Sequence, residues 1–297
     1  MNSSAQLYLP SETYKIILIM AIIIIPVTML FFSHVPTPYG RFYNKDIWGP
    51  NLDEKNAWCI MESTGLIMFL VFYFLLKNNH KFDYVPLFLL GMWVFHYINR
   101  ALIYPFIIMK QKYKKFPMIL VILGFFYLSM FAYLNAKNVA NNPKYTLSWF
   151  KTPAFIIGVI VFFIGFIINV WADCKIAYNK KENKEMVVDS TDFKFYETGQ
   201  FNFGKMFDNK IYFENSEKKN YHLPTGGLYD YVSSPNYLGE IIEWSGWAIA
   251  TWSLPGVLFA LGAIGCIGVR ALHTHKWYEQ NFENLPKERK ALIPFIL

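Results

Sequence analysis

Ionisable and amide side chains interrupt stretches of this sequence that are otherwise apolar enough to lie in lipid. In the stretch 84–109, Tyr97, Arg100 and Tyr104 are three and four residues apart, so a helix would carry them on one face. Stranding an ionisable group in a bilayer costs several kcal/mol, and such a group is by default a functional-site hypothesis. The spacing therefore predicts that this face lines a chamber with a chemical task.

Polar residues gather in the same way at one end of other apolar stretches. They are Glu62; Asn169 and Asp173; Asn236, Glu240 and Glu243; and Arg270, His273, His275 and Tyr278. The opposite ends of these stretches carry almost nothing comparable. We therefore expect a helical bundle whose polar groups surround a cavity that opens on one side of the membrane.

Several of these residues also have a purely structural interpretation. For Arg100 it is an intramembrane ion pair with Glu62 or with an aspartate. Asp173 and Lys175 could be ordinary charged residues at the membrane interface. For Asn169 it is a hydrogen bond between helices.

Metal and disulfide chemistry are not expected. His273 and His275 are two residues apart and would point in different directions on a helix, which argues against a metal site. The three cysteines, Cys59, Cys174 and Cys266, are scattered and form no CxxC motif. They indicate neither a disulfide framework nor a structural zinc site.

The composition defines the fold class. Hydrophobic residues make up 54% of the 297 residues and charged residues only 16%, against about a quarter in soluble domains. Apolar runs close to the ~18–20 residues that span a bilayer predict an all-α membrane protein with seven transmembrane helices in a single domain, residues 1–297. The runs are 14–32, 58–76, 84–109, 117–135, 153–172, 237–252 and 254–272.

In the last run, Gly262, Gly265 and Gly268 favour close helix packing. A dinucleotide-binding fingerprint would need a preceding strand, which this run does not have.

Basic residues are distributed unevenly between the two sides that seven spans would create. The side with the C-terminus carries 21 of the 28 lysines and arginines. Because basic residues favour the cytoplasmic face, we expect the N-terminus outside and the C-terminus in the cytosol. This placement explains the net charge of +7 without a nucleic-acid partner, and no protein partner is inferred.

The longest connection, at about 178–232, is predicted to be a cytosolic insert. Its second half alternates aromatic and polar residues, which predicts a small β-ribbon with turns at Gly199 and Asp208-Asn209. The ribbon is either a cap over the cavity or a solvated loop. After the insert, Ser234 and Pro235 predict a capped helix start, whose free N–H groups favour a phosphate.

These stretches together resemble the steroid 5α-reductase family over nearly the whole chain, apart from the N-terminus and residues 182–219. The longest matching stretches are YVSSPNYLGEIIEWSGWAIATWSLPG (231–256) and GVRALHTHKWYEQNFENLPKERKALIPFIL (268–297). Shorter ones are YGR (39–41), AWCIMES (57–63), HYINRALIY (96–104) and INVWAD (168–173).

Members of this family are seven-helix membrane reductases that use NADPH to reduce a carbon–carbon double bond conjugated to a carbonyl. The resemblance implies that Glu62 and Tyr97 hold the carbonyl oxygen of the substrate. The cofactor residues that it implies are Tyr39, Trp58, Arg100, Asn169, Asp173, Lys180, Tyr221, Asn236, Glu240, Arg270, His275, Tyr278 and Arg289. A steroid 3-oxo-4-ene is the first substrate expected; a polyprenol-like aldehyde and an enoyl thioester are alternatives.

The chain departs from the family pattern at a few positions. Lys180 matches a family arginine, which weakens bidentate phosphate recognition and leaves the preference for NADPH over NADH open. Met61 stands where family members can carry glutamine, Thr274 where a histidine is familiar, and Ile108 replaces an asparagine.

The implied chemistry suits the implied residues. Hydride attack on the β-carbon of an enone drives negative charge onto the carbonyl oxygen, and each of two donors aimed there is worth roughly 3–4 kcal/mol. Tyr97 donates through its phenol, whereas Glu62 donates only when protonated, as a carboxyl in an apolar site can be. The nicotinamide performs the redox step, and the acid that protonates the α-carbon is not identified.

Two other classes remain open. A membrane methyltransferase of the isoprenylcysteine type, which would use S-adenosylmethionine, resembles the C-terminal region more distantly. A seven-helix receptor or transporter would not need acids and amides at the cytosolic helix ends.

For the reductase we expect NADPH to arrive from the cytosol and the apolar substrate from the lipid. The expected location is the inner membrane of a bacterium or the endoplasmic reticulum of a eukaryote.

Overall fold

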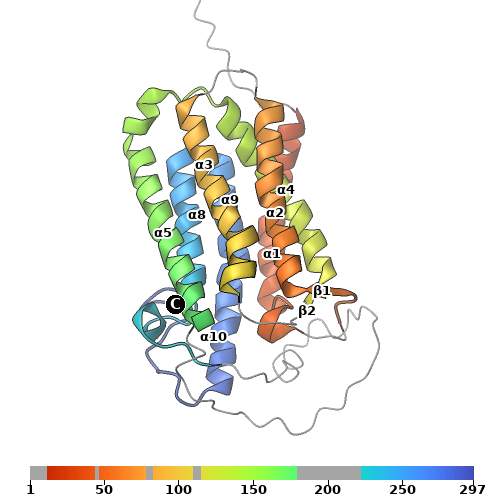
Figure 1. Cartoon of the computed structure of the whole chain (residues 1–297), viewed down its shortest axis with the longest axis vertical. Coiled ribbons are helices and arrows are strands. Elements are labelled where there is room, and N and C mark those ends of the chain that lie inside the picture. The colour runs from red at the N-terminus through yellow and green to blue at the C-terminus, as the bar shows by residue number, and fades with distance from the viewer. Residues whose placement is uncertain (1–11, 44–46, 78–82, 110–114, 179–221) are drawn as a thin grey trace, which may run out of the picture.

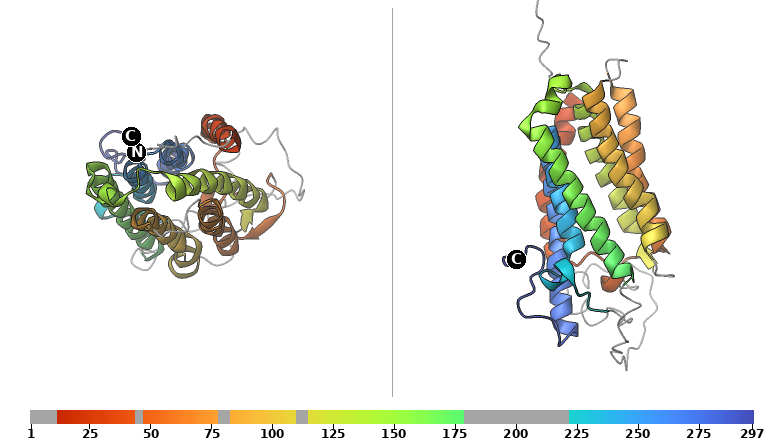
Figure 2. Two further views of the ribbon diagram at one scale, coloured as in Figure 1. Left: turned by 90° about the horizontal axis from the view of Figure 1, so that it is seen from above. Right: turned by 60° about the vertical axis from the view of Figure 1, so that its left-hand side comes forward.

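Helices that run roughly along a common axis make up most of the computed structural model (Figures 1 and 2). The model describes residues 12–43, 47–77, 83–109, 115–178 and 222–297. The β-ribbon predicted in the insert lies outside these residues, and so do Lys180 and Tyr221.

The described elements follow one another along the chain in a fixed order. They are α1 (Glu12–His34), η1 (Gly40–Phe42), β1 (Asn51–Asp53), α2 (Glu54–Leu76), α3 (Tyr84–Ile98), the π-helical η2 (Asn99–Ile108), β2 (Lys115–Pro117), α4 (Met118–Asn141), η3 (Leu147–Lys151), α5 (Pro153–Tyr178), η5 (Gly227–Asp230), α8 (Pro235–Thr251), α9 (Leu254–Ala263), the π-helical η6 (Ile264–Gly268) and α10 (Val269–Asn281). Strands β1 and β2 pair antiparallel with Leu52 opposite Phe116. They lie at the same end of the bundle as α10 (Figure 1), which we call the polar end.

Six helices in the described part are long and apolar enough to cross a membrane. They span Glu12–His34, Glu54–Leu76, Tyr84–Ile108, Met118–Asn141, Pro153–Tyr178 and Leu254–Asn281. The remaining predicted run, 237–252, forms α8, whose 17 residues give a length of about 25 Å against a hydrocarbon core of ~30 Å. A mostly helical membrane bundle with six candidate spans is thereby confirmed, while the seventh span and the sides of the termini stay predictions.

Large apolar side chains cover the outside of the bundle, as a lipid environment requires. Leu30, Phe126 and Ile167 are each more than 60% exposed. Polar residues mark the helix starts instead: the Asp53 carboxylate accepts from two backbone N–H groups of α2, and Ser253 caps α9.

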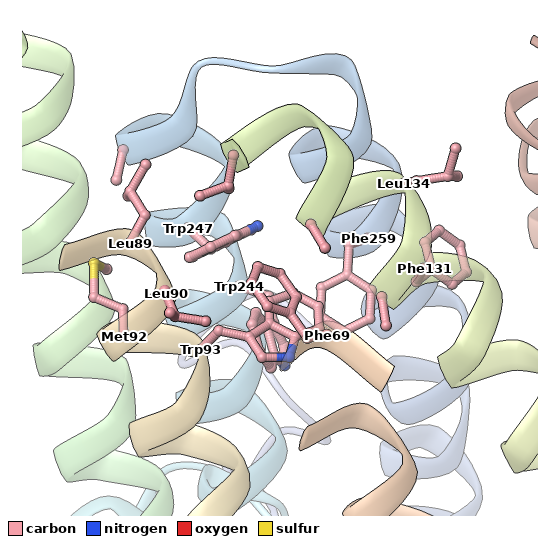
Figure 3. Packing of buried hydrophobic residues seen from close by; sticks show 14 of the residues in the cluster. Phe69, Leu89, Leu90, Met92, Trp93, Phe131, Leu134, Trp244, Trp247 and Phe259 are labelled. Carbon is pink, nitrogen blue, oxygen red and sulfur yellow. The ribbon is translucent and has the colours of Figure 1, made fainter. Parts of the chain in front are cut away.

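A cluster of aromatic rings forms the centre of the bundle, between α2, α3, α8 and α9 (Figure 3). Trp93 stacks on Phe69 with ring centroids 4.5 Å apart and lies 4.9 Å from Phe259. Its Nε1 donates to the carbonyl of Gly65 at 3.0 Å. Trp93 therefore fixes α3 against α2, immediately before the residues that the sequence assigns to the site.

Helices α5 and α8 approach each other closely, because glycines of each helix face the backbone of the other. A Cβ atom on Gly165 would meet the backbone of Gly239 and Glu243. A second contact of the same kind joins Gly158 and Gly246 to the opposing helix. Because the glycines are seven residues apart on both helices, the two backbones stay in contact over two turns, as small residues allow in membrane proteins.

The glycines that were predicted to pack closely behave differently. Gly262 faces the hydroxyl of Tyr127, and a Cβ at Gly265 or Gly268 would make only ordinary van der Waals contacts. The prediction of close packing is therefore wrong for Gly265 and Gly268, where the helix widens into the π-helical η6.

The end of the bundle opposite the polar end holds a hydrogen-bonded group of buried residues. Trp247 Nε1 donates to Asn135 Oδ1 at 3.0 Å. Asn138 donates to the hydroxyl of Tyr145 at 2.9 Å, and this hydroxyl donates to the carbonyl of Thr251 at 2.8 Å. Asn135 and Asn138 belong to α4, which is not one of the stretches whose opposite ends were expected to carry little polar chemistry. The bonds among these groups give them a structural task.

Replacing Gly165 by alanine tests the α5–α8 contact. We expect Gly165→Ala to lower stability by about 1–3 kcal/mol, because the methyl group overpacks two backbones. Thermal unfolding in detergent measures this loss. Gly91→Ala is the matched control, since a Cβ on Gly91 meets nothing within 4 Å and alanine favours the helix. Equal unfolding temperatures for the wild type and Gly165→Ala would contradict the contact.

Candidate functional site

A cavity of about 200 Å³ lies at the polar end, between α2, η2, α5, α8 and α10. Its wall contains six residues of the predicted cofactor site: Tyr39, Trp58, Asp173, Asn236, Arg270 and Tyr278. Residues from five separate segments therefore meet there, although the sequence places them as much as 239 positions apart.

Acid and amide side chains form a buried network beside the cavity. Arg100 Nη1 donates to Asp173 Oδ2 at 3.2 Å, and Asn236 donates to Asp173 Oδ1 at 3.0 Å. Asn169 donates to the backbone carbonyl of Asn236 at 2.9 Å and to Glu240 Oε2 at 3.3 Å. The network joins η2, α5 and α8 just beyond the glycine contact, so the close helix packing brings these groups within hydrogen-bonding range.

Two of the structural alternatives are therefore present. Arg100 forms an ion pair with Asp173, and Asn169 forms a hydrogen bond between helices. Both contacts were expected if these residues have a purely structural role. An ion pair between Glu62 and Arg100 within 4 Å is not formed among the residues that the structure describes. Glu62 is thus left available for another task.

Aromatic rings form one wall of the cavity and hold the Arg100 guanidinium in place. Its central carbon lies 4.5 Å from the ring centroid of Tyr104 and 5.1 Å from that of Trp58. Tyr39 meets the edge of Trp58 with centroids 5.5 Å apart. The arginine is therefore oriented by cation–π contacts as well as by Asp173.

Arg270 holds the segment after α1 against α10. Its Nη1 and Nη2 donate to the carbonyls of Thr37 and Tyr39 at 2.8 and 3.1 Å, and its Nε donates to the hydroxyl of Tyr237 at 2.9 Å. Burial raises the pKa of Tyr39 far above its usual range in spite of the positive charge of Arg270. The Tyr39 hydroxyl therefore stays protonated and can donate into the cavity.

Two further residues of the predicted cofactor site, His275 and Arg289, lie near the cavity, and Tyr278 in its wall is held by a neighbouring arginine. Tyr278 receives a hydrogen bond from Arg41 Nη2 at 3.1 Å, and His275 Nδ1 shares one with Ser233 Oγ at 2.7 Å. Arg289 is 2% exposed and donates Nη1 to a backbone carbonyl in the cavity wall at 3.1 Å. The C-terminal segment thus contributes to the same site.

Glu62 and Tyr97 come from neighbouring helices, Glu62 from α2 and Tyr97 from α3. The ring of Tyr97 lies directly against the position where Gly65 would carry a side chain, and Glu62 is one helical turn before Gly65 on α2. Tyr97 is 1% exposed, and Glu62 and Tyr97 interact electrostatically. Neither residue lines the cavity itself, but Trp58 does, one turn before Glu62.

A buried acid–base pair lies beside Tyr97. His96 Nδ1 and Glu243 Oε1 are 2.8 Å apart, and the two side chains are 2% and 0% exposed. The pair ties α3 to α8 at the height where α8 rests on Gly165. The resemblance assigned no role to either residue, although the i, i+7 spacing from Asn236 had placed Glu243 on the polar face.

Some residues of the site carried no usable signal in the sequence. Tyr237 is four residues before Ile241 and reads as part of an apolar stripe, yet it accepts from Arg270. The carbonyl of Thr37 is a backbone group, so its role leaves no trace in residue types. Arg41 belonged to a matching stretch and to a basic loop, which hid its contact with Tyr278.

Buried polar atoms around the cavity have no hydrogen-bond partner among the residues that the structure describes. They include the donors Trp58 Nε1, Arg100 Nε, Ser234 Oγ, and Arg289 Nε and Nη2. Ser234 precedes α8 but makes no side-chain cap, so the predicted capping bond is wrong. Burying unpaired donors is costly, and a ligand rich in acceptor oxygens, such as a dinucleotide, would pair them.

The fold and this site define a multi-pass membrane protein with a ligand chamber inside one end of its helical bundle. Residues 114–204 and 189–297 match the family model described as 3-oxo-5-alpha-steroid 4-dehydrogenase. The chain belongs to this family of oxidoreductases.

Similar proteins come from plants and animals. The chain is 33% identical to a steroid 5-alpha-reductase of Solanum lycopersicum over 272 residues, which is 91% of each chain. It is 31% identical to 3-oxo-5-alpha-steroid 4-dehydrogenase 1 of Rattus norvegicus over 273 residues, or 91% of this chain and 90% of the rat protein. A steroid 5-alpha-reductase of Arabidopsis thaliana is 32% identical over 279 residues, with 91% and 92% covered.

A double-mutant cycle on His96 and Glu243 tests how much the structure depends on this pair. We expect His96→Leu to lower the free energy of unfolding by about 1–3 kcal/mol, because it leaves a buried carboxyl group without its hydrogen-bond partner. His96→Leu with Glu243→Leu should regain most of that loss, which a chemical or thermal unfolding series measures. Additive losses would mean that the two side chains do not act as a pair.

Proposed function

We propose that this protein reduces the C4–C5 double bond of a 3-oxo-4-ene steroid, or of a similar enone lipid, at the expense of NADPH. The observation that carries the proposal is that Tyr97 packs against Gly65, one helical turn from Glu62, near a cavity around which buried donors have no partner among the described residues. The names of the curated relatives, which are steroid 5-alpha-reductases and 3-oxo-5-alpha-steroid 4-dehydrogenases, support the same reaction.

The residues proposed to bind NADPH supply what an anionic, acceptor-rich ligand needs. Trp58, Arg100 and Arg289 offer unpaired N–H donors, and α8 begins at the cavity wall, where Ser234 and Asn236 lie. Backbone N–H groups at a helix start favour phosphate. Tyr39, Asn169, Asp173, Glu240, Arg270, His275 and Tyr278 complete the proposed binding set, to which the resemblance adds Lys180 and Tyr221.

In the proposed reaction the protein stabilises charge and excludes water. Bound NADPH would supply the hydride that adds to the β-carbon. Tyr97 donates its phenolic hydrogen to the carbonyl oxygen, and protonated Glu62 donates a second hydrogen bond, so the developing enolate oxygen is held from two sides. The core around Trp93 keeps water from this place, which strengthens both bonds.

The apolar surface of the bundle suits a substrate that arrives from the lipid. We propose that the polar end faces the cytosol, that α8 is the seventh span, and that the N-terminus lies on the other side. Lys175, Lys276 and Lys290 all lie at the polar end, in keeping with the preference of basic residues for the cytoplasmic face. The membrane would be the inner membrane in a bacterium or the endoplasmic reticulum in a eukaryote.

Substitution of the two proposed carbonyl-binding residues tests the reaction. In detergent, testosterone or progesterone should drive NADPH oxidation by the wild type. Glu62→Leu and Tyr97→Phe should each lower kcat by about 10²–10³-fold, because each removes a donor at the enolate oxygen. Tyr145→Phe removes a buried hydroxyl at the opposite end of the bundle and serves as the control, with turnover kept. Full turnover in both site variants would refute the assignment of the carbonyl pair.

Ligand-dependent thermal shifts separate reduction from methyl transfer. NADPH at 100 times its Kd should stabilise the wild type by about 2.7 kcal/mol, and S-adenosylmethionine should not stabilise it. Trp58→Phe keeps the ring contacts but loses the unpaired Nε1 donor, so we expect several-fold weaker NADPH binding with little change in the unliganded protein. Stabilisation by S-adenosylmethionine alone would favour the methyltransferase class.

A further inference from the structure

The last residues of the chain expose large apolar side chains outside the membrane-spanning helices. Phe295 and Ile296 are 79% and 77% exposed, and Leu297 is 46% exposed. Tyr231, whose ring centroid lies 5.7 Å from that of Phe295, is 49% exposed. In water, a contiguous apolar patch of this kind marks an interaction surface.

This C-terminal tail, residues 291–297, is an ordered turn. The backbone N–H groups of Leu292 and Ile293 both donate to the carbonyl of Leu297 at 2.7 Å, which closes the chain end on itself. Phe295 has a φ of 66°, a left-handed conformation that is unfavourable for a bulky residue. The turn is held so that its apolar side chains point away from the protein.

The tail is joined to the wall of the candidate site. Ala291 and Leu292 are buried and pack against α8 and α10. The N–H of Ser233 donates to the carbonyl of Lys290 at 2.8 Å, and the N–H of Lys290 donates to the carbonyl of Tyr231 at 2.9 Å. Since Ser233 lines the cavity, whatever holds the tail in place also holds this wall.

The tail lies at the side of the bundle, level with the end of α5, whereas α10 extends further (Figure 1). The turned view also shows the chain end projecting outward from the bundle (Figure 2). Exposed aromatic residues, Trp171 at 37% and Tyr178 at 48%, mark the same end of α5. Aromatic side chains collect at the boundary between membrane and water, so this level corresponds to the interface.

We propose that the C-terminal tail is an interfacial membrane anchor, which buries Phe295, Ile296 and Leu297 at the boundary between lipid headgroups and acyl chains. Its partner is the bilayer in which the helices already stand. Insertion turns the exposed apolar area of the tail into buried area. The bilayer thereby fixes the wall of the cavity through the Ser233–Lys290 contact.

Spin labels measure where the tail lies. The full-length protein, with its three cysteines replaced by alanine, is reconstituted in nanodiscs of phosphatidylcholine and phosphatidylglycerol. Ile296→Cys carries the label at the proposed anchor, Glu283→Cys carries it at an exposed polar position of the same C-terminal segment, and Ile160→Cys carries it in mid-span on α5. Collisions with oxygen report lipid, and collisions with a water-soluble nickel chelate report water.

We expect the label at position 296 to collide more often with oxygen than with the nickel chelate, with a depth between that of position 160 and that of position 283. Equal behaviour of positions 296 and 283 would place the tail in water and overturn the proposal. Dipolar broadening at position 296 in nanodiscs with two copies, together with low access to both reagents, would show a second copy of the chain as the partner and overturn it as well.

A second measurement does not depend on labels. In Phe295→Ser/Ile296→Ser the anchor is weakened, and we expect faster hydrogen exchange of the Ser233 amide, because its acceptor on Lys290 is held less firmly. Leu254→Ser, at an exposed position on the far end of the bundle, is the control. Unchanged exchange in the double variant would separate the tail from the cavity wall. Both measurements are independent of enzymatic turnover.

Discussion

The backbone contact between α5 and α8 is the constraint on which the rest of the site depends. At Gly165 and Gly239 each helix rests on the other's main chain, which leaves no freedom in their separation. Asn169 and Asp173 follow on one helix, and Asn236 and Glu240 face them from the other. A larger residue in either place would push the helices apart and open each of these hydrogen bonds. The glycines thus set the helix separation that brings the polar residues of the site within hydrogen-bonding distance.

The two ends of the bundle differ in how completely their buried polar groups are paired, although the Tyr73 hydroxyl at the far end also has no hydrogen-bond partner among the described residues. At the far end, Asn135, Trp247 and Tyr145 bond to one another and to backbone, so helix ends are joined at little cost. At the polar end, Trp58 Nε1 and Arg100 Nε have no hydrogen-bond partner within the part of the chain that the structure describes. In a protein whose buried polar groups only held helices together, we would expect these groups to be paired at both ends, as Asn135, Trp247 and Tyr145 are at the far end. The contrast between the ends therefore sets the chamber apart from ordinary packing.

Helical periodicity predicted which polar residues lie at the same end of the bundle. Spacings of three, four and seven residues placed Arg100, Asn169 and Asp173 at one end of the bundle, and the structure joins them there. Periodicity does not tell which helices touch, so the Asn135–Trp247 bond at the far end was missed. The glycine repeats at 158, 165, 239 and 246 were a readable signal for the α5–α8 contact. Residue types do not reveal the role of backbone carbonyls, such as those of Thr37 and Tyr39 that accept hydrogen bonds from Arg270. Residue spacing also does not predict that η2 is π-helical.

The hydrogen-bonded plug at the far end has a consequence for exchange with the surroundings. Asn135, Asn138 and Tyr145 are at most 5% exposed and fill the place where a second aqueous approach would lie. With the topology proposed above, we expect water-borne molecules to reach the chamber from the polar end. A reductase with this layout would follow the ratio of reduced to oxidised nucleotide on that side of the membrane and stay insensitive to the other, whatever the direction from which its apolar substrate arrives.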